Sequence, residues 1–207
     1  MTIRIREEPA SVLAHYADVS IAYEVRERLA VLAPDSGLGG LRLVAEPVAP
    51  PYWKDYDAEP GNHPTAWAER FDVARWGVLA AFTGTERSGG AVVAWGTPEV
   101  ALLGARADLA VLWDLRVVPD RRGRGVGAAL FRAAEAWAVS RGAGWLVVET
   151  QNVNVAACRF YARQGCVLGA VHRFAYPALP DEVQLLWYKP SRASGRAGER
   201  GAAADGA

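Results

Sequence analysis

The chain has 207 residues, of which 51% are hydrophobic and 22% are charged. This composition supplies enough apolar material for one core, and it excludes both a disordered chain and a small disulfide-stapled scaffold. Lys plus Arg and Asp plus Glu both number 23, so the formal net charge is zero and no global field favours nucleic acid or an anionic membrane.

The two ends of the chain and its apolar runs bear on location and domain number. The N-terminus lacks the apolar run of a signal peptide, and no uninterrupted apolar stretch approaches the roughly 18 residues of a membrane span. Residues 191–207 carry no large apolar side chain, which predicts a flexible tail after a single domain over residues 1–190. We therefore expect a soluble, cytoplasmic protein without nucleic-acid or membrane partners.

The first half of the chain contains mainly β-type signals. Residues 19–32 mix apolar and charged side chains at roughly helical spacing, which predicts a helix that ends at the turn of residues 34–37. Residues 41–47 predict a short strand before a loop rich in Pro and Tyr. Residues 76–83 and 90–95 are β-type runs joined by a glycine-rich turn, which predicts a hairpin.

The second half alternates strands and helices. A strand is predicted over residues 109–118, and a helix over residues 126–141 because its apolar side chains fall on one face. A strand over 145–150 and a helix over 154–164 follow, and two short β-type runs close the chain. An antiparallel front half and a strand–helix–strand–helix back half imply a mixed sheet flanked by helices.

The segment between the strand at 109–118 and the following helix has the features of a phosphate site. It carries three glycines and three arginines: Gly123, Gly125 and Gly127, with Arg121, Arg122 and Arg124. Glycines let the backbone approach a ligand closely, and a helix N-terminus adds unsatisfied N–H donors and partial positive charge. These features predict a pyrophosphate site, with a tight turn carrying solvated arginines as the alternative. The spacing fits neither a P-loop nor a dinucleotide fingerprint.

Two motifs together resemble a known family. The run Arg122-Gly-Arg-Gly-Val-Gly matches the Arg/Gln-x-x-Gly-x-Gly/Ala signature of the GNAT superfamily of N-acetyltransferases. Residues 154–166 resemble that superfamily's Asn-x-x-Ala-x-x-Phe-Tyr-x-x-x-Gly-Phe segment, with Cys166 in place of the usual Phe. Asp114-Leu-Arg-Val, Glu149-Thr-Gln-Asn and Glu182-Val-Gln-Leu-Leu-Trp-Tyr are similar to the streptothricin acetyltransferase branch in particular.

This resemblance implies a GNAT-type α/β (α+β) fold, with a mixed, mostly antiparallel central sheet flanked by helices. Two central parallel strands, here those ending at Val118 and Thr150, would splay apart, and acetyl-CoA would lie in the gap as acyl donor. The cofactor-binding residues would be Val117, Val118, Arg122, Gly123, Arg124, Gly125, Val126, Gly127, Asn154 and Tyr161. A helix-capping role alone would also explain Asn154. No metal is expected, because the histidines and cysteines lack metal-ligand spacing.

Acetyl transfer from a thioester to an amine needs an acid and a base. The resemblance makes Tyr161 the candidate proton donor to the departing thiolate, because a phenol can donate without being ionised at neutral pH. Asp114 and Glu149 are the candidate bases or amine anchors, and the sequence does not decide between them. Alternation along 109–118 places Asp114 and Arg116 on one face with Ala110, so a salt bridge between the two is the alternative for Asp114.

The acceptor amine must be recognised elsewhere. Aromatic and acidic residues gather around Tyr52 and Trp53, which suits a cation, although a solvated loop with its aromatics on the core is equally consistent. We therefore place Tyr52, Trp53, Asp114, Glu149 and Glu182 in the acceptor site. The expected activity is direct acetyl transfer from acetyl-CoA to a primary amine of a small molecule, such as a streptothricin-like antibiotic. Protein N-terminal or lysine acetylation and a non-catalytic acyl-CoA sensor are the alternatives, and a homodimer is compatible with the composition.

Overall fold

The computed structural model describes residues 2–104 and 106–191. Residues 192–207, most of the expected tail, therefore lie outside the described part of the chain. Ser191, its first residue, is buried, and its N–H donates to the carbonyl of Gly144 at 2.9 Å. No helix within the described ranges is long and apolar enough to cross a membrane.

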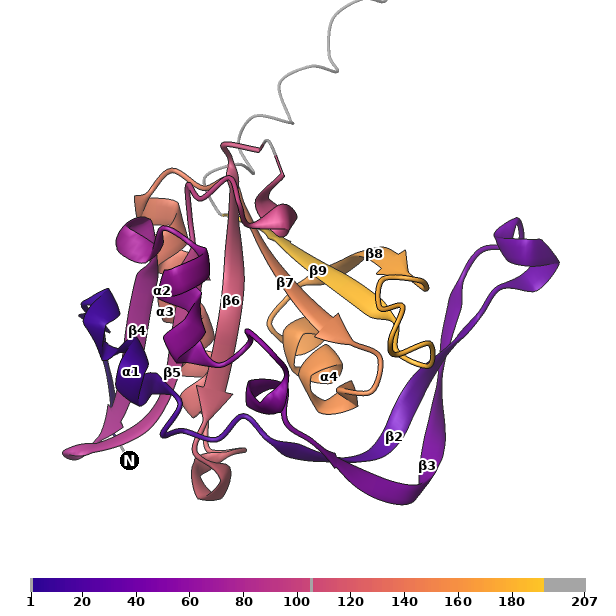
Figure 1. Ribbon diagram of the computed structural model, residues 1–207, viewed down its shortest axis with the longest axis horizontal. Coiled ribbons are helices and arrows are strands. Elements are labelled where there is room, and N and C mark those ends of the chain that lie inside the picture. Colours follow the sequence, from indigo (N-terminus) through magenta and orange to yellow (C-terminus); the bar gives the residue numbers. More distant parts are fainter. Residues whose placement is uncertain (1, 105, 192–207) are drawn as a thin grey trace, which may run out of the picture.

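A seven-stranded sheet in the order β1-β4-β5-β6-β7-β9-β8 forms the body of the molecule (Figure 1). The strands are β1 (Ile3–Glu8), β4 (Gly77–Thr83), β5 (Glu86–Ala94), β6 (Leu109–Val117), β7 (Trp145–Gln151), β8 (Val167–His172) and β9 (Gln184–Pro190). Neighbouring strands are antiparallel except β6 and β7, which run parallel. The predicted mixed, mostly antiparallel sheet is confirmed.

Helices cover both faces of this sheet. On one face, α3 (Val126–Ser140) buries Leu130 and Phe131, and α4 (Val155–Arg163) adds Tyr161 to the same core. On the other face, the short helices α1 (Leu13–Tyr16) and α2 (Pro64–Arg70) bury Tyr16 and Trp67 in a second core. The sheet therefore lies between two cores, each filled by alternate side chains of its central strands.

The two parallel strands separate along their length. They pair only through Leu109–Val111 of β6 and Trp145–Val147 of β7, although β6 continues to Val117 and β7 to Gln151. Figure 1 shows the two ribbons diverging beyond this short ladder. The predicted splay of the central parallel pair is confirmed, since the two strands are not paired with each other beyond this ladder.

A β-bulge in β6 changes which side chains share a face. The register with β5 skips one residue at Trp113. Asp114 consequently lies on the face of Leu109, where it hydrogen-bonds Tyr16 of the second core. Ala110, which was expected to share a face with Asp114, lies on the opposite face, in the core under α3. The simple alternation expected for this strand is wrong beyond the bulge, because one extra residue reverses the order of the faces.

A two-stranded arm leaves the body and extends past α4 (Figure 1). It consists of β2 (Tyr23–Leu32) and β3 (Arg42–Lys54), paired antiparallel. The helix expected over residues 19–32 is wrong: the buried and partly buried apolar side chains Val25, Leu29 and Val31 recur with the period of a strand. The loop expected after residue 47 is also wrong over its first part, because β3 continues to Lys54. A short 3-10 turn, η3 (Tyr56–Ala58), then leads back to the body.

Candidate active site

The turn before α3 has open space above a helix N-terminus. Gly123 and Gly125 adopt φ values of 73° and 87°, a left-handed conformation that L side chains rarely adopt. A Cβ built on either glycine would meet no heavy atom within 4 Å. Within the described chain, the N–H groups of residues 126–128 have no acceptor outside the helix. Such free donors beside open space fit the pyrophosphate of a coenzyme A molecule.

The three arginines of this segment have different surroundings. The Nε of Arg122 donates to the Val117 carbonyl at 3.0 Å, and its Nη atoms donate to two carbonyls just before β2, while burial lowers its pKa. Arg121 lies 3.1 Å from the carboxylate of Glu86. Arg124 is exposed and makes no hydrogen bond or ion pair with the described residues. Arg124 therefore offers its charge to a phosphate, whereas Arg122 secures the turn.

The edge of β6 presents backbone groups to the gap between the parallel strands. The N–H of Val118 donates to the Ser88 carbonyl at 3.0 Å, so it is committed to β5. Successive residues of an antiparallel ladder direct their backbone groups to opposite edges, so the N–H of Val117 points toward β7. Of the two predicted backbone donors, Val117 is thus the one that faces the gap.

Two predicted cofactor contacts lie at the start and on the inner face of α4. Asn154 caps the helix, since its Oδ1 accepts from the N–H of Ala157 at 3.1 Å. Tyr161 packs against the rings of Phe131 and Phe160 at 5.9 and 5.1 Å, and its hydroxyl has no hydrogen-bond partner among the described side chains. Burial, and then the negative charge of Asp114, raise the pKa of Tyr161 well above its ordinary value. The phenol is therefore protonated at neutral pH and unengaged.

Asp114 belongs to a buried network of opposite charges. Its Oδ1 accepts from the Tyr16 hydroxyl at 2.8 Å and from the Arg116 Nε at 2.9 Å, and its Oδ2 accepts from the Arg116 Nη2 at 2.7 Å. The same guanidinium binds Asp57 at 2.8 and 3.0 Å. The salt bridge considered as an alternative for Asp114 is therefore formed. These contacts compensate its charge, so they suit a structural role, and its catalytic role stays a prediction.

Glu149 has a different environment. It accepts hydrogen bonds from the Tyr176 hydroxyl at 2.5 Å, from the Gln184 Nε2 at 2.8 Å and from the Gln151 Nε2 at 3.3 Å. All three donors are uncharged, and no described Lys, Arg or His forms an ion pair with this half-buried carboxylate. Burial, and then the Glu149 charge, raise the pKa of Tyr176. A carboxylate held in place without a cation is suited to bind an ammonium group.

Glu182 forms a second acidic position with a buried partner. Its Oε1 lies 2.6 Å from the Lys54 Nζ, and the two residues are only 7% and 8% exposed. The other oxygen, Oε2, is buried without a hydrogen-bond partner among the described residues. The Lys54 Nζ also lies 5.4 Å from the ring of Tyr56, whose hydroxyl is 2.9 Å from that of Tyr23.

Aromatic side chains surround this ion pair. Burial raises the pKa of Tyr52, Tyr56 and Tyr176, and the nearby charge of Glu182 adds to the rise in each case. The fold therefore gathers β3, η3 and the β8–β9 connection around Glu182. Of the predicted acceptor residues, Tyr52 is 41% exposed and near this cluster, whereas Trp53 is 73% exposed on β3.

The partners that hold these acidic groups were not predicted from the sequence. They are Tyr176, Gln151 and Gln184 around Glu149, and Lys54 beside Glu182. Gln151 lies two residues after Glu149 in β7, so strand alternation places both side chains on one face of the sheet. Gln184 is the residue of β9 that pairs with Gln151. Tyr176 and Lys54 carry no such local signal.

Comparisons with known proteins fit this geometry. Residues 45–166 match the model of the acetyltransferase (GNAT) family. The chain is 38% identical over 81 residues to streptothricin acetyltransferase A of Bacillus subtilis (strain 168), which covers 38% of this chain and 47% of that protein. It is 31% identical over 149 residues to the streptothricin acetyltransferase of Streptomyces lavendulae, and this match covers 72% of this chain and 75% of that protein.

Solved structures extend the similarity over nearly the whole chain. A candidate streptothricin acetyltransferase from Bacillus anthracis str. Ames, in complex with acetyl coenzyme A, is similar with a TM-score of 0.70 and 26% identity. The similarity covers 91% of this chain and 99% of that one. By sequence, this chain spans about half the length of the Bacillus subtilis and Escherichia coli relatives that it matches, 47% and 48%.

Proposed function

Because the chain belongs to the acetyltransferase (GNAT) family, in its streptothricin acetyltransferase-like branch, we propose that it transfers an acetyl group from acetyl-CoA directly to a primary amine of a streptothricin-type antibiotic. One observation carries the proposal: the open N-terminus of α3 follows one strand of the splayed pair, β6, and the uncompensated carboxylate of Glu149 lies on the other, β7. The first suits a phosphate-bearing acyl donor, and the second suits a cationic acceptor.

The donor side needs groups that hold an anion and orient a thioester. Acetyl-CoA supplies the activated acetyl group. The free N–H donors at the start of α3 and the charge of Arg124 would hold its pyrophosphate. The N–H of Val117, directed into the gap, would donate a hydrogen bond to the acyl oxygen, where negative charge develops during transfer.

The acceptor side needs to attract an ammonium group and then remove its proton. An alkyl amine has a pKa of about 10, so it arrives charged at neutral pH. Glu149 would bind this ammonium group through its uncompensated charge and accept the proton, directly or through one water. The acetylated product is a neutral amide that Glu149 no longer attracts, which favours release of the product.

The departing thiolate must gain a proton. Tyr161 holds a proton on a hydroxyl that no described side chain engages. It would donate this proton to the sulfur as the bond between the acetyl carbon and the sulfur breaks, and would regain a proton from solvent afterwards. Asp114 and Arg116 would orient the strand end and η3, rather than exchange protons.

The location and assembly are further parts of this proposal. Acetyl-CoA is an intracellular metabolite, so the enzyme would act in the cytoplasm, without nucleic-acid or membrane partners and without a metal ion. Leu32, Leu38 and Leu41 expose apolar surface near the end of the arm, which would suit a homodimer contact. Light scattering of the purified protein tests this: a monomeric mass at micromolar concentration contradicts the dimer.

A thiol-release assay with acetyl-CoA and a panel of amines tests the activity. The panel contains streptothricin, aminoglycosides, polyamines, amino acids and short peptides. We expect streptothricin to give the highest kcat/KM, and Tyr161→Phe to lower kcat by about ten- to a thousandfold with the KM for acetyl-CoA unchanged. Turnover of peptides alone would favour a protein acetyltransferase, and acetyl-CoA binding without any turnover would favour a sensor.

A further inference from the structure

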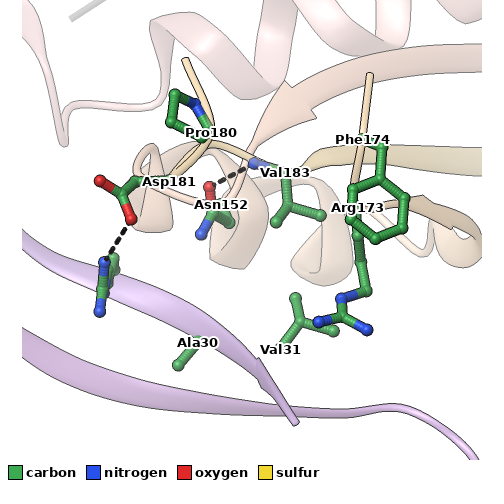
Figure 2. Close-up of a pocket in the computed structure, with 9 residues that line it drawn as sticks. Ala30, Val31, Asn152, Arg173, Phe174, Pro180, Asp181 and Val183 are labelled. Carbon is green, nitrogen blue, oxygen red and sulfur yellow. Dashed lines mark hydrogen bonds and ion pairs between the residues drawn. The ribbon is translucent and has the colours of Figure 1, made fainter. Parts of the chain in front are cut away.

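A pocket of about 240 Å³ lies between the arm and the segment that joins β8 to β9 (Figure 2). The arm contributes Arg28, Ala30 and Val31, and the joining segment contributes Arg173, Phe174 and Asp181. None of these residues has a part in the chemistry described above. A ligand pocket for a drug-sized molecule holds roughly 300–1,000 Å³, so this one suits a single ring-sized group.

The pocket offers both hydrogen-bond donors and acceptors. Arg173 forms no hydrogen bond or ion pair within the described ranges, and its guanidinium carbon lies 5.5 Å from the ring of Phe174, which is 78% exposed. The side chain of Asp181 is 90% exposed, and its one ion pair within those ranges is a 3.9 Å contact with Arg28. An exposed contact of this length is weak, so the carboxylate remains available to a ligand.

Figure 2 shows how these groups are arranged. Asp181 and the pair Arg173 and Phe174 lie on opposite sides of the pocket, and Ala30 and Val31 border it along the arm. The guanidinium of Arg173, the carboxylate of Asp181 and the ring of Phe174 thus surround the apolar side chains of Ala30 and Val31. The Arg28 Nε also lies 3.5 Å from the Glu46 carboxylate, so two guanidinium groups and two carboxylates balance here, and no net charge favours a cation or an anion.

The segment that joins β8 to β9 contributes residues both to the pocket and to the proposed acceptor site. Tyr176 of this segment hydrogen-bonds Glu149, and Glu182 follows the pocket residue Asp181 directly in the chain. The environment of Tyr52 spans both regions: besides partial burial, the charges of Glu182, Arg28 and Asp181 all act on its pKa. A molecule bound through its amine at Glu149 could therefore place a distant part in the pocket.

We propose that this pocket is a second acceptor subsite that binds an uncharged, ring-sized group carrying a carbonyl and an N–H, such as a carboxamide or a lactam. This inference rests on the proposed function. The carbonyl accepts a hydrogen bond from Arg173, the N–H donates to Asp181, and the ring stacks on Phe174. The subsite selects large acceptors over simple amines by binding a part of the molecule that does not react.

Steady-state kinetics of the full chain test the subsite. Arg173→Gln and Phe174→Ala each remove one of its groups from an exposed position, and Arg163→Gln and Val167→Ala are matched exposed controls outside the pocket. We expect each pocket variant to raise the KM for streptothricin about tenfold, with kcat and the KM for acetyl-CoA unchanged. The KM for ethylenediamine, or its inhibition constant against streptothricin, should not change, because this short diamine does not reach the pocket.

The outcomes separate the subsite from the proposed function. Normal streptothricin kinetics in both pocket variants, or an equal loss with streptothricin and the diamine, overturns the subsite and leaves the proposed function standing. If the control variants raise the KM for streptothricin as much as the pocket variants do, the subsite is likewise overturned. Absence of streptothricin turnover by the unsubstituted chain, with simple amines acetylated, overturns the proposed acceptor and the subsite with it.

Discussion

Glu149 and Asp114 are carboxylates on the two strands that splay apart, and their hydrogen-bond partners separate their roles. Arg116 and Tyr16 donate to both oxygens of Asp114, so its charge is compensated and its position is set. Glu149 receives hydrogen bonds only from uncharged groups of the described chain. Glu149 is therefore the carboxylate of the two that has no cation beside it among the described residues, and an incoming ammonium group should pair there.

The substitutions Glu149→Gln and Asp114→Asn test this division. We expect Glu149→Gln to lower kcat/KM for the amine about a hundredfold with only a small change in the free energy of unfolding, because it removes the base while its amide oxygen can still accept from Tyr176 and Gln151. Asp114→Asn should mainly lower stability, by about 1.5–3 kcal/mol, because it weakens the charge-assisted hydrogen bonds from Arg116 and Tyr16, although Arg116 keeps its ion pair with Asp57. Kinetics and urea unfolding of both variants are the measurements. The reverse pattern would assign the base to Asp114.

At the scale of elements, helix α3 begins and ends at left-handed glycines. Gly125 precedes its first residue with φ 87°, and Gly142 follows its last turn with φ 89°. A Cβ at either position would meet no heavy atom within 4 Å, so the two differ mainly in which end of the helix they occupy. The N-terminal end has free N–H donors and is the proposed phosphate site.

The pair Gly125→Ala and Gly142→Ala separates backbone strain from ligand contact. Both variants should lose about 1–2 kcal/mol of stability, because alanine is strained in the left-handed region. Only Gly125→Ala should raise the KM for acetyl-CoA, by at least about tenfold, since its methyl group would project into the space of the phosphates. Equal KM values for the two variants would contradict the phosphate site.

At the scale of the whole molecule, the arm and the body are joined by contacts between distant parts of the chain. The side chain of Asn152, just after β7, donates to the Leu29 carbonyl of β2 at 3.0 Å and accepts from the N–H of Val183, just before β9, at 2.8 Å. The buried ion pair of Lys54 and Glu182 joins the base of the arm to the segment before β9. These contacts border the proposed acceptor site.

The Lys54–Glu182 pair should show strong coupling. Lys54→Met leaves the Glu182 carboxylate buried without its cation, which should cost about 3–5 kcal/mol of unfolding free energy. The double variant Lys54→Met/Glu182→Leu should recover most of this loss, because it removes both buried charges. Urea unfolding of the two single variants and the double variant measures the coupling. Additive losses would show that the two side chains do not depend on each other.

Local signals predicted much of the back half of the fold. The helix expected over residues 126–141 is Val126–Ser140, and the strand expected over 145–150 is Trp145–Gln151. Apolar periodicity and flanking glycines act within one element, so they can be read without its neighbours. The hairpin of β4 and β5 was predicted for the same reason.

Errors occurred where pairing between distant segments overrides local preference. Tyr23–Leu32 contains Glu, Arg, Leu and Ala, which favour helices, yet pairing with β3 makes it a strand. No element was assigned to β1, α1 or α2, whose short segments are stabilised by the sheet and the second core. The bulge at Trp113 is visible only in the register with β5.

By itself, the sequence determined the donor half of this protein: the family, the splayed pair of strands and the glycine turn before α3, because these depend on motifs contiguous in the chain. Only the tertiary structure decided the acceptor half. It showed that Asp114 is compensated by Arg116, that Tyr176 hydrogen-bonds Glu149 from 27 residues away, and that Lys54 and Glu182 pair across 128 residues. Charge compensation depends on distances in space, and a sequence does not contain those distances until the chain has folded.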